Sequence, residues 1–174
     1  NHWYPELTCD NHRIDPEHPK DYHLSVDLVD RAIEFFRDQK SVTPEKPLFL
    51  NLAFGACHAP HQAPDEFITP YREVFQAGYD HTREQRLARQ LELGIVPPGT
   101  QLTPRHSGVK PWDALPPERQ ASFIQLQAAY AGMMEHADAQ LGRFVDFLEE
   151  IGQLDNTVLF VLSDNGASQE GTPI

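Results

Sequence analysis

The longest periodic pattern in the chain lies between residues 117 and 151, and it constrains the fold more than any other feature. Apolar side chains recur there at steps of three or four residues, at Phe123, Leu126, Tyr130, Met133, Ala137, Leu141, Phe144 and Leu148. That spacing places them on one face of an amphipathic helix, which has to be buried against other elements. Pro117 suits the first turn of such a helix and Gly152 suits its end.

Two glycines, Gly132 and Gly142, lie inside this predicted helix. Glycine in a helix interior costs about 1 kcal/mol relative to alanine. We therefore expect another part of the backbone to pack closely against the helix at both positions.

Three shorter helices are predicted at residues 25–40, 65–75 and 82–93. The first is amphipathic, with Ser25 as its expected N-cap, because serine side chains accept hydrogen bonds from the first free backbone N–H groups. The third is expected to end at Gly94. Residues 1–23 and 94–117 are rich in turn-forming residues and are predicted to be loops, the second of which is expected to cover a surface or border a site.

Two short apolar runs, LFLNLAF at residues 48–54 and TVLFVL at residues 157–162, predict strands. They are too short for buried helices and too uniformly apolar for half-exposed strands, which is typical of inner strands of a parallel sheet. Their alternation with helices implies parallel strands joined by right-handed crossovers. The predicted fold class is therefore α/β, with a mostly parallel sheet flanked by helices.

Composition excludes several classes of partner. The 174 residues carry a formal net charge of −12 and no cluster of Lys and Arg, so nucleic acid and anionic membrane surfaces are poor partners. No apolar run approaches the roughly 20 residues that cross a bilayer. Two cysteines, Cys9 and Cys57, form neither a disulfide framework nor a zinc-finger pattern. The chain opens on Asn1 without a signal peptide, so we expect a piece of a longer protein, and the sequence favours neither a periplasmic or secreted nor a cytoplasmic location.

Polar residues follow both apolar runs. Asp164 and Asn165 follow the second run, and a carboxylate beside an amide oxygen offers the hard oxygen ligands that Ca²⁺ or Mg²⁺ prefers. His58 follows the first run. Because ligands collect beyond the carboxyl ends of parallel strands, a cation site and an imidazole are expected to share one pocket suited to hydrolysis of an anionic ester.

Simpler readings of these residues are also open. Asp-Asn-Gly is common turn chemistry, and His58 fits equally well as an ordinary loop histidine. His61 is the weaker of the two loop histidines as a candidate, and Pro60 excludes a helical His-x-x-His metal motif. The remaining histidines receive no role.

The chain resembles the central part of bacterial-type arylsulfatases, which belong to the sulfatase family in the alkaline phosphatase superfamily. The resemblance rests on WYPEL and DNH near the start, PLFLNLAFGACHAPHQAP, REQRLARQLELGIVPPGTQLTPR, WDAL and GQLDNTVLFVLSDNGAS, in the family's order. It implies an incomplete alkaline phosphatase-like fold, in which residues 1–174 form part of a catalytic domain truncated at both ends.

The resemblance also implies a chemistry. Family members hydrolyse sulfate esters with a formylglycine, made from the first residue of a Cys/Ser-x-Pro-x-Arg motif, while Ca²⁺ polarises the sulfate. By position, Asp164 and Asn165 match two of the metal ligands. His58 matches the imidazole that contacts the sulfate and helps the leaving oxygen to take a proton.

The match is incomplete, because the chain contains no Cys/Ser-x-Pro-x-Arg motif. The run from Cys9 to Arg13 comes nearest, but Asn11 stands where proline is required. We therefore expect the nucleophile and the other metal ligands to lie in a full-length parent, and the isolated chain to be inactive. The alternatives are a phosphodiester or phosphonate monoester hydrolase of the same superfamily, and a non-catalytic interaction module. The oligomeric state is not indicated.

Overall fold

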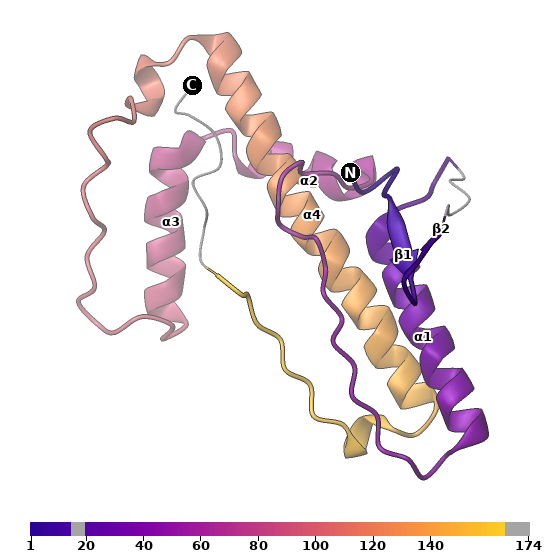
Figure 1. Ribbon diagram of the computed structural model, residues 1–174. Helices are drawn as coiled ribbons and strands as arrows, with labels where there is room; N and C mark the ends of the chain where they lie inside the picture. Colours follow the sequence, from indigo (N-terminus) through magenta and orange to yellow (C-terminus); the bar gives the residue numbers. More distant parts are fainter. Residues whose placement is uncertain (15–19, 166–174) are drawn as a thin grey trace.

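The computed structural model describes residues 1–14 and 20–165, which form four α-helices and one small hairpin (Figure 1). The helices are α1 (Leu24–Val42), α2 (Asp65–Val74), α3 (Gly78–Glu92) and α4 (Pro117–Glu150). Two short 3₁₀ turns, η1 (Trp112–Ala114) and η2 (Leu154–Asn156), flank α4, and the hairpin consists of β1 (Leu7–Cys9) and β2 (His12–Ile14). Figure 1 shows α1 and α3 on opposite sides of α4.

The long helix predicted from the apolar repeat is confirmed as α4. Pro117 occupies its first turn, and Gly152, with φ of +66°, turns the chain beyond its end. Its buried positions run from Ala128 to Leu148 and include Met133, Phe144 and Leu148 of the repeat, whereas Leu126 of the repeat is 51% exposed. Among the described residues, no helix is long and apolar enough to cross a membrane.

The C-terminal half of α4 packs against α1. Val29 and Ala32 of α1 form one hydrophobic cluster with Phe144, Phe147 and Leu148 of α4. The predicted helix at 25–40 is confirmed, but its N-cap is His23 and not Ser25. The Nδ1 atom of His23 accepts a hydrogen bond from the backbone N–H of Ser25 at 3.1 Å, which leaves the serine side chain without the capping role.

The N-terminal half of α4 packs against α2. Ile68 of α2 shares a second hydrophobic cluster with Ala128 and Met133 of α4. At Gly132 the two backbones approach so closely that a Cβ atom would lie 2.7 Å from the carbonyl oxygen of Phe67. The expectation of close packing is confirmed at this glycine. It is wrong at Gly142, where an added Cβ would meet nothing within 4 Å.

The long loop after α3 is held against that helix. The Asp80 carboxylate binds Arg105 at 2.9 Å and accepts from the backbone N–H of Trp112 at 3.0 Å. The Trp112 ring lies where a Cβ on Gly78 would stand, and φ of +80° at Gly78 suits glycine. This packing starts α3 four residues before the predicted Thr82, while Gly94, with φ of +68°, follows the helix end as predicted.

The predicted parallel sheet is wrong for the part of the chain that the structure describes. Its one sheet is the antiparallel pair β1–β2, in which Leu7 faces Ile14 and Cys9 faces His12. This hairpin also corrects the prediction that residues 1–23 form only a loop. The two apolar runs at 48–54 and 157–162 are extended, but neither pairs with another described strand.

The physical reason lies in what covers the two runs. Leu52 and Phe54 pack against the α1–α4 cluster, whereas Phe49 is 95% exposed. In the second run Phe160 is 84% exposed on one face and Val161 is 77% exposed on the other, so neither face is buried. A parallel sheet requires neighbouring strands with both faces covered, and that condition is not met here. The described fold is mainly helical.

Replacing Gly132 by alanine tests the closeness of the α2–α4 contact. The added methyl group has to displace the backbone of α2, so we expect a loss of about 1–3 kcal/mol in the free energy of unfolding. Gly142→Ala is the matched control in the same helix, and we expect it to stabilise by up to about 1 kcal/mol. Urea denaturation followed by circular dichroism measures both changes. Equal effects of the two substitutions would contradict the close contact.

Candidate functional site

His58 belongs to a loop, residues 55–64, that follows the first extended run and is called the His58 loop below. The loop rests on α4 and α2, because Ala63 is buried in the cluster of Ala128 and Met133 and Ala56 packs against the same cluster. It therefore has a fixed support on the helical frame although the predicted sheet is missing.

The His58 side chain is exposed and has a defined orientation. Its Nδ1 atom lies 2.8 Å from the carbonyl oxygen of Ala59, and its backbone N–H donates to Gly55 at 2.9 Å. A carbonyl oxygen can only accept, so Nδ1 carries the proton. The Nε2 atom then accepts a hydrogen bond in the neutral ring and donates one in the imidazolium. That geometry suits contact with an anion and proton exchange.

Tyr130 of α4 supports the other side of the loop. Its ring contacts His61 edge to face at 5.2 Å between centroids, so His61 has a packing role. Burial raises the pKa of the Cys57 thiol, and a hydrogen bond with Tyr130 partly offsets that rise. Cys9, in contrast, is exposed in the hairpin.

Asp164 and Asn165 are exposed at the end of the second extended run. The Ser163 hydroxyl donates to the backbone oxygen of Asn165 at 2.6 Å, and Gly166, the glycine of the Asp-Asn-Gly sequence, lies outside the described residues. The two side chains have the oxygen chemistry that Ca²⁺ prefers, but Ca²⁺ takes about six to eight ligands. Within residues 1–14 and 20–165, no group of three or more His, Cys, Asp or Glu side chains could hold a metal ion. The described residues alone therefore do not fit a calcium site.

The convergence of His58 with Asp164 and Asn165 was predicted from a shared sheet edge, and that sheet is not formed. In Figure 1 both extended runs lead away from the C-terminal end of α4, so they share a general direction. A common site for the three side chains stays a prediction.

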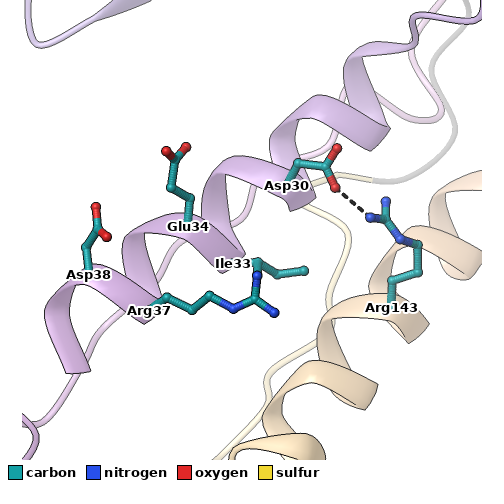
Figure 2. A pocket seen from close by; sticks show the side chains of 6 residues that line it. All are labelled: Asp30, Ile33, Glu34, Arg37, Asp38 and Arg143. Atoms are coloured by element: carbon teal, nitrogen blue, oxygen red, sulfur yellow. Dashed lines mark hydrogen bonds and ion pairs between the residues drawn. The ribbon is translucent and has the colours of Figure 1, made fainter. Parts of the chain in front are cut away.

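A surface groove between α1 and α4 has a volume of about 420 Å³ (Figure 2). It is lined by Asp30, Ile33, Glu34, Arg37, Asp38 and Arg143. Arg143 reaches across it to Asp30 at 2.5 Å, and the Arg37 guanidinium lies 5.1 Å from the centre of the Phe147 ring. None of the predicted site residues lines this groove. Arg143 and Arg37 each contact the other helix, through Asp30 and Phe147. The groove is therefore part of the packing between α1 and α4.

Sequence reasoning missed a buried group of three histidines, His2, His23 and His136, which we call the histidine cluster. These three residues are 6%, 2% and 3% exposed. One signal was available for His136, which lies three residues after Met133 on the apolar face of α4. Nothing local marks the other two as buried.

Comparison with known proteins identifies the family. The Sulfatase family model matches residues 1–173. The chain belongs to the sulfatase family. It is 40% identical over 129 residues to an arylsulfatase of Klebsiella aerogenes, and 34% identical over 165 residues to an uncharacterized sulfatase of Schizosaccharomyces pombe. These alignments cover 74% and 94% of this sulfatase chain.

A more distant relative comes from the wider superfamily. The multifunctional alkaline phosphatase superfamily protein PehA of Trinickia caryophylli is 23% identical over 158 residues, or 85% of the chain. The chain spans 28% of the length of PehA and of the Klebsiella arylsulfatase, and 29% of the length of the Schizosaccharomyces sulfatase. The family identification from the sequence is confirmed, and the match to a partial segment of the relatives is confirmed with it.

Thiol alkylation tests the contact between Tyr130 and the His58 loop. Because the Cys57 pKa is raised and Cys57 is half-buried, we expect iodoacetamide to modify Cys57 more slowly than Cys9. Tyr130→Phe removes the hydrogen bond that lowers the Cys57 pKa, so it should slow Cys57 further and leave Cys9 unchanged. Peptide mass spectrometry measures both rates in one sample. An unchanged Cys57 rate in the variant would contradict the contact.

Proposed function

We propose that this sulfatase chain is part of a calcium-dependent sulfuric ester hydrolase of the arylsulfatase type. The observation that carries the proposal is the 40% identity with the Klebsiella arylsulfatase over 129 residues. The residues at the two predicted site positions, His58 and the pair Asp164–Asn165, supply chemistry that such a hydrolase uses. The proposed substrate is a small-molecule sulfate ester.

In this proposal His58 is the residue that meets the sulfate group. Its Nδ1–H bond to Ala59 orients the ring, and Nε2 is the atom that we propose to interact with a ligand oxygen. As an imidazolium, Nε2–H can donate a hydrogen bond to the anionic ester or a proton to the departing oxygen. The exposure of His58 is consistent with access for a small substrate.

Asp164 and Asn165 are proposed as two of the calcium ligands of the full-length protein. The remaining ligands and the formylglycine nucleophile would then come from residues outside this chain, since its 174 residues contain no Cys/Ser-x-Pro-x-Arg motif. We expect the isolated chain to have no hydrolase activity.

Calcium affinity checks the incomplete metal site. Two oxygen ligands leave most of the coordination positions of Ca²⁺ to water, so the isolated chain should bind Ca²⁺ more weakly than about 1 μM. Isothermal titration calorimetry on the 174-residue chain measures this affinity, with Asp164→Asn as the variant that removes the charged ligand. Sub-micromolar binding that is lost in Asp164→Asn would show that this chain completes the site alone.

A hydrolysis assay tests the proposal itself, with the protein encoded by the longest reading frame that contains this chain. We expect cleavage of an aryl sulfate and a fall in kcat of about 10²- to 10⁴-fold in His58→Asn, because proton donation to the departing oxygen is lost. The asparagine amide can still donate to Ala59, so the loop should keep its shape. His61→Asn is the control in the same loop and should retain activity. Full activity of His58→Asn would contradict the role of His58.

A second candidate is a phosphodiester or phosphonate monoester hydrolase of the same superfamily. The similarity to PehA over 85% of the chain is the observation that favours it, although the identity is 23%. An assay of the protein encoded by the longest reading frame, on an aryl phosphodiester as well as on an aryl sulfate, separates the two candidates. A higher kcat/KM for the aryl sulfate supports the sulfatase proposal, and the opposite ranking supports the alternative.

A further inference from the structure

The histidine cluster joins three distant parts of the chain. His2 comes from the amino-terminal segment, His23 caps α1 and His136 lies in α4. The rings of His2 and His23 stack at 5.5 Å between centroids, and those of His23 and His136 meet edge to face at 4.3 Å. Three imidazoles are therefore packed against one another in the interior. The described residues contain no group of three or more side chains that could hold a metal ion, so the cluster in this arrangement is no metal site.

The hydrogen bonds of His23 require a neutral ring. Its Nδ1 accepts the Ser25 backbone N–H at 3.1 Å, and its Nε2 lies 3.1 Å from the carbonyl oxygen of Gln62, to which it donates. Protonation of Nδ1 would place two N–H groups face to face and remove the cap of α1. The Nδ1 atoms of His2 and His136 are buried without a partner among the described residues, so a proton there would gain no acceptor.

The cluster is attached to the His58 loop at both of its ends. Gln62 accepts twice, with its backbone oxygen from His23 and with its side-chain Oε1 from the His2 backbone N–H at 2.8 Å. At the other end the His2 ring lies against Gly55, where a Cβ atom would stand 2.6 Å from the His2 Cε1. The position of the cluster therefore fixes residues 55 and 62, on either side of His58.

Within residues 1–14 and 20–165, the neighbouring elements offer no countercharge to the cluster. The groups whose charges act on the three rings are the other imidazoles and the α-amino group beside His2, all of one sign. On α1, Asp27 is engaged by Tyr22 and Arg31. On α4, Gln140 is uncharged, Glu135 pairs with Tyr71 and Asp138 is exposed, while α2 presents the ring of Phe67.

We propose that the histidine cluster positions the His58 loop in a pH-dependent way: its neutral rings hold the loop, and proton uptake below neutral pH releases it. The catalytic purpose of the loop rests on the proposed function, but the structural effect does not. The members of the cluster are positioning residues, because they act on His58 through Gln62 and Gly55.

The direction of the pH effect follows from the environment of the rings. Burial lowers the pKa of all three, and burial followed by the charges of His23 and His2 lowers the pKa of His136 to about 4. A lowered pKa means that the unfolded chain binds protons more tightly, so stability is complete above about pH 6.5 and is lost as the pH falls. For His136 alone, the unfolding equilibrium constant should rise about twentyfold between about pH 7 and pH 5.

Urea denaturation of the 174-residue chain at these two pH values tests the proposal. The quantity compared is the factor by which the unfolding constant rises from about pH 7 to about pH 5. We expect this factor to be about 20 times larger in the unsubstituted chain than in His136→Gln, which cannot take up the proton. His81→Gln replaces an exposed histidine of α3 and should keep the full pH dependence. Equal pH dependence of the unsubstituted chain and His136→Gln would overturn the proposal.

Two measurements need no substitution in the cluster, in case His136→Gln fails to fold. Proton NMR should show three histidine Cε1–H resonances with a pKa below the ordinary value of about 6.5, and titration of all three near that ordinary pKa would overturn the proposal. Loop release should raise the labelling rate of Cys57 relative to Cys9 by a methanethiosulfonate at about pH 5, with helical circular dichroism retained. A constant ratio would overturn it. None of these results depends on sulfate hydrolysis, so failure of the proposed function would be seen separately.

Discussion

Burial of one face of α4 holds the described part of this chain together. The face meets α1 through Phe144, Phe147 and Leu148, and it meets α2 through Ala128 and Met133. Each large apolar side chain that is buried in this way contributes about 1.5–3 kcal/mol. His136 lies between the two clusters and contacts Phe67 of α2 as well as His23 of α1. The point where the two helix contacts meet is thus polar, and the His58 loop is attached there.

The accuracy of the sequence predictions follows how local each feature is. The helices were predicted because an apolar repeat is a property of neighbouring residues, and the end of α4 near Gly152 follows from the same local chemistry. The hairpin was missed because its strands have three residues each, too few for a pattern. Its turn consists of Asp10 and Asn11, both with positive φ, a combination that short polar residues tolerate.

Pairing of strands is not a local property, which explains the error in the fold class. The residue pattern at 157–162 predicts an extended backbone, but it does not indicate which strand would pair with it. In the described part of the chain, the side chains of this run are exposed to solvent. The site was predicted by residue type in the same local way. His58, Asp164 and Asn165 have the chemistry of a hydrolase site, but their convergence requires a framework that residues 48–54 and 157–162 do not form. The histidine cluster could not be predicted because burial of His2 and His23 arises only when α1, α4 and the amino-terminal segment meet.

In the described structure, α4 and its two helix contacts form the stable frame, and the second extended run is unpaired. Amide hydrogen exchange on the 174-residue chain, read by mass spectrometry, measures the stability of both parts. We expect the slowest exchange in the buried stretch of α4 from Ala128 to Leu148, and exchange at the rate of an unstructured peptide in residues 157–162. Protection of residues 48–54 and 157–162 equal to that of α4 would show that the two runs are paired strands, and it would contradict this account.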